Sequence, residues 1–161
     1  MKFIADSMLG RLARWLRLLG YDTLYFPDIQ DRLLIRIARE EDRVLLTRDT
    51  RLVRMRGLRR YLLLHENDPF GQLKKVITTF DLGTHPIFFE SKKMGCVPRL
   101  YSRCSLCNTS LEEVSKEQAK LHVPEYVYQT SDAFKQCPSC GKFYWKGTHP
   151  ELLRKKLRDI F

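Results

Sequence analysis

Three aspartates in this chain are placed where they could hold a divalent cation. Asp6 follows the apolar run at residues 3–5, Asp49 closely follows another at 44–46, and Asp31 stands before an amphipathic segment. Carboxylates gathered at one edge repel one another unless a cation neutralises them, and their oxygens suit Mg²⁺ or Mn²⁺. Such ions support phosphodiester hydrolysis. Each aspartate alone also has a structural interpretation, because Asp is a common helix cap.

Four cysteines form the second group with recognisable chemistry. Cys104 and Cys107 make one Cys-x-x-Cys pair, and Cys137 and Cys140 make another. Two such pairs surround Zn²⁺ tetrahedrally at bond lengths of about 2.3 Å, with no position left for a catalytic water. Disulfides are the alternative, but an intracellular protein of this size does not need them, and Cys96 would remain odd. We therefore predict one structural zinc site.

Alternating strands and helices are needed to position the aspartates. Short apolar runs predict strands, and apolar residues at three- and four-residue spacing predict helices between them. This order predicts an α/β fold with a mainly parallel sheet and helices on both faces, so that the aspartates share one edge. We expect strands at residues 3–5, 22–26, 43–47 and 61–64, and helices at about residues 9–19, 31–41, 49–56 and 70–80.

The helix faces follow from the same spacing. In the first helix Arg11, Arg14 and Arg17 fall away from the apolar face. In the second helix we expect a buried side made of Leu33, Leu34, Ile37 and Ala38.

The character of the chain changes near residues 83–86, which we interpret as a connector. Residues 87–89 add an edge strand or pack back onto the sheet. The cysteine-rich remainder contains strand-like segments at 126–128 and 143–145, a small insertion at 111–127 and a basic helix from about Pro150. We divide the chain into residues 1–90 and residues 91–161.

The charge of the chain favours a polyanionic partner. The formal net charge is +10 and the pI is about 9.6. Nucleic acid fits better than an anionic membrane, because no segment combines a wide apolar face with a lysine-rich one. No apolar run approaches the ~20 residues that span a bilayer, and the first residues lack the apolar core of a signal peptide. We expect a soluble, cytoplasmic protein.

Several segments together resemble the Mut-seven C-terminal RNase family. They are residues 4–23, 45–49, 104–108 and 137–149, which cover nearly the whole chain in the family's order. The resemblance implies a PIN-like nuclease domain over residues 1–90, followed by a small C4 zinc ribbon over residues 91–161. It also implies a metal-dependent ribonuclease activity.

The resemblance assigns roles to individual acids. Asp6 matches the acid after the first strand, Asp49 the acid of the Thr-Arg-Asp motif, and Asp31 the acid that opens the preceding helix. Asp28 lies about one helical turn from Asp31 and is a weaker candidate for the same role. Asp68 is a weaker candidate for the fourth acid that PIN nucleases often have.

Substrate contacts are expected from basic residues of both domains. Thr47 is a further weak catalytic candidate, which would orient a ligand or water. Arg11, Arg14 and Arg48 would bind phosphate in the nuclease domain, although arginines on a solvated helix face are often only surface. In the ribbon, Lys142 and Lys146 would bind phosphate, with Lys135 and the cluster at 154–158. Residues 143–145 would either stack on unpaired bases or form the small core beside the metal.

The preferred function is therefore a Mg²⁺- or Mn²⁺-dependent endoribonuclease that acts on single-stranded or unstructured RNA. Its partner would be RNA, with the ribosome or tRNA as candidate forms. One alternative is a non-catalytic RNA- or ribosome-binding protein on a PIN scaffold. Another is a nuclease that acts on DNA.

Overall fold

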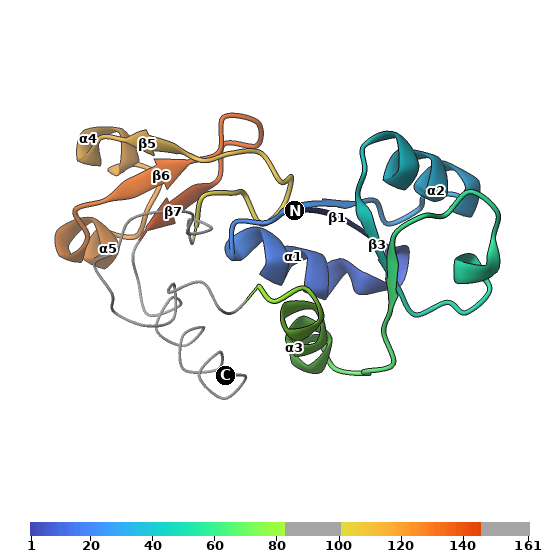
Figure 1. Cartoon of the computed structure of the whole chain (residues 1–161). Helices are drawn as coiled ribbons and strands as arrows, with labels where there is room; N and C mark the ends of the chain where they lie inside the picture. Colours follow the sequence, from blue (N-terminus) through green and yellow to red (C-terminus); the bar gives the residue numbers. More distant parts are fainter. Residues whose placement is uncertain (83–100, 146–161) are drawn as a thin grey trace.

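The computed structural model describes residues 1–82 and 101–145 (Figure 1). This part of the chain contains a four-stranded parallel sheet and a three-stranded antiparallel sheet. Of the helices in these ranges, none has the length and apolarity needed to cross a bilayer. Several predictions lie outside the described residues: the boundary near residue 90, the connector at 83–86, the segment at 87–89, Cys96, Lys146, the helix from Pro150 and the cluster at 154–158.

The parallel sheet confirms the predicted architecture. Its strand order is β2-β1-β3-β4, and β1 lies parallel to both of its neighbours. In this register Ala5 is opposite both Tyr25 and Leu46, so the three strands end side by side. The strands are β1 (Lys2–Ala5), β2 (Asp22–Tyr25), β3 (Val44–Thr47) and β4 (Tyr61–Leu63).

Helices cover both faces of this sheet, as predicted. Alternate residues of a strand point to opposite faces, so the buried strands contribute to two cores. Phe3 and Leu46 belong to the core that contains residues of α1 and α3, whereas Ile4 and Leu45 pack with residues of α2 and η2. The elements are η1 (Ser7–Leu9), α1 (Gly10–Leu18), α2 (Asp31–Glu40), η2 (Leu52–Arg54) and α3 (Pro69–Thr79).

Two local predictions about the helices were wrong. The helix expected at 49–56 is only the short 3₁₀ helix η2. In α2, Leu33 is 38% exposed and Ile35 is buried in its place. The reason is geometric, because Leu34, Ile35 and Ala38 lie on one side of the helix at spacings of one and four residues, and Leu33 begins the neighbouring side.

The antiparallel sheet forms a second, smaller unit. It has the order β5-β6-β7, and α4 and α5 lie in sequence between β5 and β6. Its core is small, with Ala119, Val127 and Phe134 fully buried. The elements are β5 (Glu112–Val114), α4 (Lys116–Ala119), α5 (Glu125–Thr130), β6 (Phe134–Gln136) and β7 (Phe143–Trp145).

The strand expected at 126–128 is part of helix α5 instead. The Tyr-Val-Tyr alternation suggested a half-buried strand, but a short helix buries a single residue equally well. Val127 packs into the small core, while Tyr126 is 68% exposed. The strand predicted at 143–145 is confirmed as β7.

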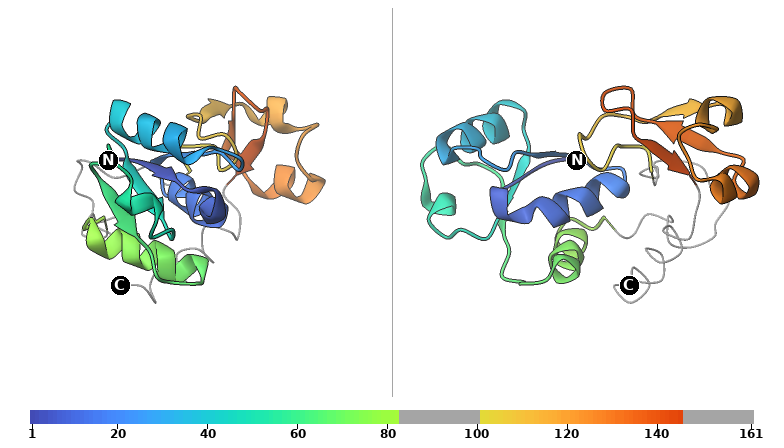
Figure 2. Two further views of the ribbon diagram at one scale, coloured as in Figure 1. Left: turned by 90° about the vertical axis from the view of Figure 1, so that its right-hand side faces the viewer. Right: turned by 180° about the vertical axis from the view of Figure 1, so that it is seen from behind.

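The second unit contacts one end of the parallel sheet, beside the end of α1 (Figure 2). The amide of Tyr101 donates to the carbonyl of Leu18 at the end of α1, and Asn108 bonds to the start of β2. These contacts lie at the amino ends of the strands. Asp6 and Asp49 lie at the carboxyl ends of the strands, and therefore at the opposite end of the sheet from these contacts.

Candidate functional site

Thr47 links Asp6 and Asp49 at the carboxyl ends of β1 and β3. The Thr47 hydroxyl donates to Oδ2 of Asp6 at 2.6 Å and accepts from the amide of Asp49 at 3.0 Å. A hydroxyl has one proton to donate, so this arrangement commits it to the carboxylate of Asp6. The parallel register thus brings together two of the three predicted acids and one of the weaker candidates.

Asp6 is a buried carboxylate that has no basic partner among the described residues. The residue is 6% exposed, and in residues 1–82 and 101–145 no Lys or Arg nitrogen lies within 4.0 Å of its carboxylate. Its oxygens accept from Thr47 and from the amide and hydroxyl of Ser7. A buried charge that has hydrogen bonds but no counter-charge is costly, which makes this position suitable for a cation.

Asp49 is held in its ionised form by its own turn. The amide of Arg51 donates to Oδ1 at 2.7 Å, and the Arg51 guanidinium lies 3.5 Å away. The backbone hydrogen bond from Arg51 is the main reason that the pKa of Asp49 lies below its usual value of 3.8, with the charge of Arg51 adding to it.

The remaining acids are less closely associated with Asp6. Asp31 is the first residue of α2 and is exposed, and Asp28 is exposed in the turn before it. Both residues follow β2, which is parallel to β1, so they lie toward the carboxyl ends of the strands. From there α2 leads the chain back to the amino end of β3. Asp68 caps α3 by accepting from the amides of Phe70 and Gly71 at 3.0 and 2.8 Å. The oxygens of Asp6, Asp31 and Asp49 do not all lie within 4.8 Å of one another.

The predicted phosphate-binding arginines are on the surface. Arg11 and Arg14 are exposed on α1, and Arg48 is exposed after β3, where it donates to Oδ1 of Asn67 at 2.5 Å. Arg11 lies in the first turn of α1, which starts at the carboxyl end of β1. Arg11 and Arg48 therefore flank the acidic edge, with Arg14 one turn further along α1.

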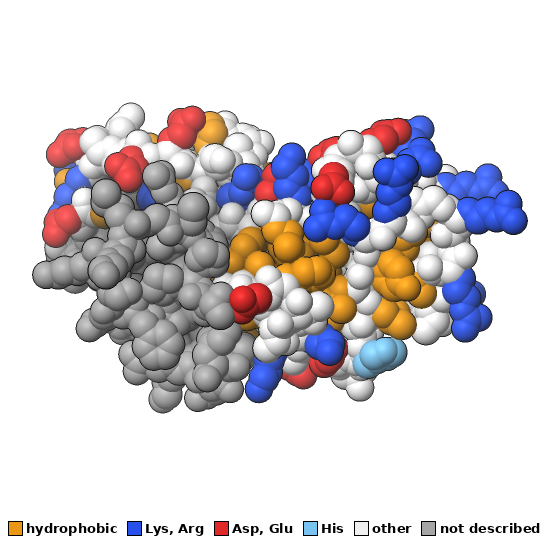
Figure 3. All heavy atoms as spheres, in the orientation of Figure 1, with side chains coloured by type: hydrophobic (Ala, Val, Ile, Leu, Met, Phe, Trp, Pro, Cys, Tyr) orange, Lys and Arg blue, Asp and Glu red, His pale blue; other side chains and the backbone are white. Residues whose placement is uncertain are grey.

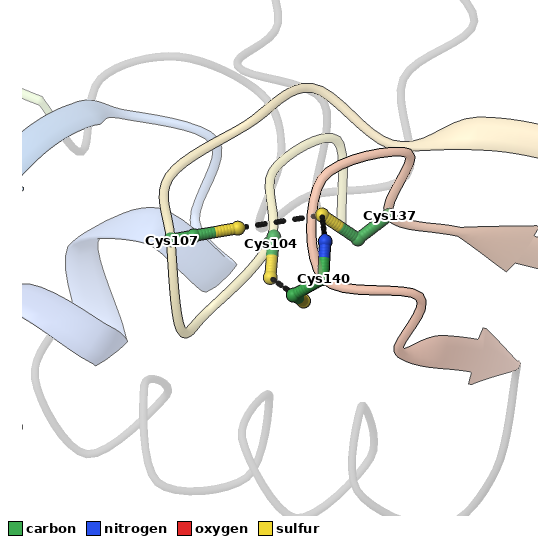
Figure 4. Close-up of side chains that lie close together, drawn as sticks. All are labelled: Cys104, Cys107, Cys137 and Cys140. Atoms are coloured by element: carbon green, nitrogen blue, oxygen red, sulfur yellow. Dashed lines mark hydrogen bonds between the residues drawn. The ribbon is translucent and has the colours of Figure 1, made fainter.

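The four cysteines form a compact group of sulfur ligands (Figure 4). Their Sγ atoms lie within 4.8 Å of one another, and none of them forms a disulfide. Cys104 and Cys140 are 3.5 Å apart, and Cys107 and Cys137 are 3.3 Å apart. Four soft thiolates at these distances fit a tetrahedral metal ion such as zinc. The group can hold a metal ion, as the two pairs predicted.

The aromatic residues of β7 support the ribbon itself. Phe143 stacks on His122 with ring centroids 4.7 Å apart, and Trp145 packs against the small core. The hydroxyl of Tyr144 lies 3.1 Å from Sγ of Cys104 and accepts from the amide of Ser105. Burial is the main reason that the pKa of Tyr144 is raised. These contacts favour the core interpretation of residues 143–145 over base stacking. Lys142 is exposed, with its amine 5.6 Å from the ring centroid of Tyr144.

The contacts that join the cysteine site to the parallel sheet were not predicted from the sequence. Arg17, expected away from the apolar face of α1, is only 4% exposed. Its guanidinium donates to the carbonyls of Thr23, Ser105 and Leu106, so the loop of the first cysteine pair covers it. No local pattern marks such a residue, because its partners are remote in sequence.

Asn108 also connects the cysteine loop to the parallel sheet, and its contacts are here called the joint. Its backbone has φ = 69°, in the left-handed region that Gly141 occupies after the second pair, with φ = 73°. Unlike Gly141, it has a side chain, which accepts from the amide of Thr23 at 3.0 Å and donates to Asp22 at 2.8 Å. The cysteine loop is thereby fixed to the edge strand β2.

We expect Asn108→Gly to lower the free energy of unfolding by about 1–3 kcal/mol, because it leaves the buried amide of Thr23 without an acceptor. Glycine keeps the left-handed backbone, so the loss isolates the side chain. The control is Gly141→Asn, where an added Cβ meets no atom within 4 Å, so that the strain of a side chain at a positive φ remains, with a cost of about 1 kcal/mol. Urea unfolding measures both. Equal effects of the two variants would contradict the stabilising role of the Asn108 side chain in this joint.

Asp22 should make the stability of the protein depend on pH in acid. Burial acts to raise the pKa of its carboxyl, but hydrogen bonds from Arg43 and Asn108 and the charges of Arg43 and Arg103 outweigh burial, and the pKa lies below 3.8. A lowered folded pKa stabilises the protein above the unfolded value, and this stabilisation disappears as the pH falls through the folded value.

The measurement is the free energy of unfolding at several pH values from neutral to below 3.8. We expect wild type to lose more stability than Asp22→Asn over the acid part of this range, since the variant has no carboxyl to protonate there. Parallel curves for the two proteins would rule out this role of Asp22. Protonation of the four cysteines, and release of a metal ion that they hold, would affect both proteins alike.

Comparison with known families gives one match over nearly the whole chain. Residues 1–157 match the family described as "Mut7-C RNAse domain". The comparisons with curated proteins and with solved structures gave no match.

Proposed function

Because this chain belongs to the Mut7-C RNAse domain family, we propose that it is a metal-dependent endoribonuclease that cleaves single-stranded or unstructured RNA. The observation that carries the proposal is the buried carboxylate of Asp6, linked through Thr47 to Asp49 and lacking a basic partner in the part of the chain that the structure describes. A catalytic cation would supply the missing counter-charge.

The donor set fits a hard divalent cation. Asp6 and Asp49 supply carboxylate oxygens from adjacent strand ends, and Asp31 supplies a third from the start of α2. Mg²⁺ or Mn²⁺ held there would activate water and stabilise the charge that develops on the cleaved phosphodiester. Asp28 is an exposed substitute for Asp31 in this proposal, whereas Asp68 already serves as the cap of α3.

The residues around the acids have supporting roles. Thr47 keeps the carboxylate of Asp6 oriented, because the hydroxyl donates to one of its oxygens while the Ser7 amide donates to the other. Arg11 and Arg48 flank this edge and bind the phosphates on either side of the cleaved bond, and Arg14 extends the contact along α1.

The cysteine site has a structural role in this proposal. Cys104, Cys107, Cys137 and Cys140 hold one Zn²⁺ that folds the ribbon, since four thiolates leave no position for substrate. The site lies at the amino end of the sheet, away from Asp6. Lys142 is exposed beside the aromatic residues of the ribbon, and it would bind a phosphate of the RNA remote from the cleaved bond.

The test is cleavage of an unstructured RNA with Mn²⁺, compared between wild type and Asp6→Asn, with an equimolar DNA of the same sequence as competitor. Cleavage that needs both the metal and Asp6 supports the proposal. Salt-dependent RNA binding without cleavage at any metal concentration would instead favour a non-catalytic RNA-binding protein, and preferential cleavage of the DNA would favour a DNA nuclease.

A further inference from the structure

The connection between β3 and β4 carries an unusual concentration of positive charge. Residues 48–60 contain six arginines and a single acid, Asp49. Because β3 and β4 are parallel, this connection starts at the acidic edge and ends at the opposite end of the sheet. Leu52 of η2 anchors it to the core beneath α2. The six arginines, all exposed, are Arg48, Arg51, Arg54, Arg56, Arg59 and Arg60.

Four of these six charges are not neutralised within the described residues. Arg48 donates to the amide oxygen of Asn67, and neither it nor Arg54, Arg56 and Arg59 has a carboxylate oxygen within 4.0 Å in residues 1–82 and 101–145. Arg51 pairs with Asp49, and Arg60 with an acid of the turn after α2. Figure 3 shows Lys and Arg side chains spread over the side of the molecule that carries α2 and this connection.

A cavity of about 200 Å³ lies at the far end of the connection. Arg39 from the last turn of α2 and Arg59 from the connection line it, together with Arg43, Arg60 and Asp42. Arg43 is bound to Asp22 and to Glu41, and Arg60 is bound to Asp42.

Arg39 and Arg59 are therefore the two cations that the cavity offers to a ligand. Neither has a carboxylate partner among the described residues, and both are exposed. Nη1 of Arg39 lies 3.7 Å from the place where a Cβ on Gly57 would stand, so the guanidinium lies beside the turn at this glycine. Planar guanidinium groups suit the bidentate binding of phosphate oxygens.

We propose that residues 48–60 together with Arg39, here called the arginine track, bind the phosphate backbone of the RNA strand that is cleaved at the acidic edge. This inference rests on the proposed function for the nature of the ligand. The track starts at Arg48, beside Asp49, and ends in the cavity between Arg39 and Arg59. Its contacts are to phosphate, so it increases affinity for long strands and adds no base preference.

The test measures binding apart from cleavage, in an Asp6→Asn background. Arg39→Ala with Arg59→Ala removes the two cavity cations. The matched control, Lys74→Ala with Lys75→Ala, removes two exposed charges from α3, on the other face of the sheet. Fluorescence anisotropy over a series of salt concentrations follows binding of unstructured RNAs of about three and about twelve nucleotides.

For the longer RNA we expect the cavity variant to bind about tenfold more weakly at low salt. The slope of log affinity against log salt should become shallower by about 1.4, because the variant loses two phosphate contacts and each contributes about 0.7 on a single strand. The short RNA should bind equally to the cavity variant and the control. If the double variant does not fold, Arg59→Gln alone should show half of the change in slope.

Equal affinities and slopes for the cavity variant and the lysine control would overturn the arginine track. Its failure is distinguishable from that of the proposed function. An inactive wild-type protein whose RNA binding still depends on Arg39 and Arg59 retains the track and loses the nuclease. Mn²⁺-dependent cleavage with binding indifferent to both arginines retains the nuclease and loses the track.

Discussion

Asp6→Asn should lower the rate of Mn²⁺-dependent RNA cleavage by about 10²–10³-fold, the scale on which one electrostatic contact to a transition state acts. The substitution removes the buried negative charge and keeps one oxygen, which can accept from the amide of Ser7. The new amide nitrogen faces Thr47, whose hydroxyl then accepts instead of donating. Folding should therefore survive while cation binding weakens. Initial rates of cleavage at a series of Mn²⁺ concentrations are the measurement, with thermal unfolding as the check of the fold.

Asp49→Asn should have a similar effect on cleavage, because its carboxylate comes from the neighbouring strand end. The matched control is Asp132→Asn, an exposed acid of the ribbon that pairs with Lys116. Rates for Asp6→Asn and Asp49→Asn that equal the rate for Asp132→Asn would refute the acidic edge as the catalytic site.

Cys104→Ser should abolish zinc binding at the proposed cysteine site and unfold the ribbon. Among the described residues the core of the ribbon has three that are fully buried, which is little apolar surface to stabilise it alone. Binding of structural zinc contributes on the order of 10 kcal/mol, and in such small units it is coupled to folding. We expect zinc content, measured by elemental analysis, to fall from one equivalent to near zero. The control Ser139→Ala keeps all four thiolates and should keep the metal.

The joint between the two units makes the loss of zinc visible in the parallel sheet. The amide of Thr23 donates to Asn108 directly after Cys107, whereas the amide of Asp6 donates to Leu46 within the sheet. Hydrogen exchange should therefore lose protection at Thr23 in Cys104→Ser and keep it at Asp6. Unchanged protection at Thr23 would show that the metal does not hold the joint. Loss at both amides would show that the two units unfold together.

Periodicity predicted most of the secondary structure and failed where tertiary packing decides. The apolar runs that became β1 and β3 are buried on both faces, and continuous runs of this kind are typical of parallel sheets. Val127 lies between two tyrosines in a pattern that suits a strand, yet it is the buried residue of α5. A segment of only a few residues does not distinguish the period of a helix from that of a strand. Packing of Val127 into the small core favours the helix here.

The sequence by itself determined the types of ligand and the elements that carry them. Two Cys-x-x-Cys pairs define a metal site, because each pair positions its own thiolates locally, and strand ends place acids at one edge of a parallel sheet. Only the tertiary structure decided that Thr47 joins Asp6 to Asp49, that Arg17 is buried, and that the cysteine site lies opposite the acidic edge. These depend on strand register and on contacts between residues far apart in the chain, which no local spacing encodes.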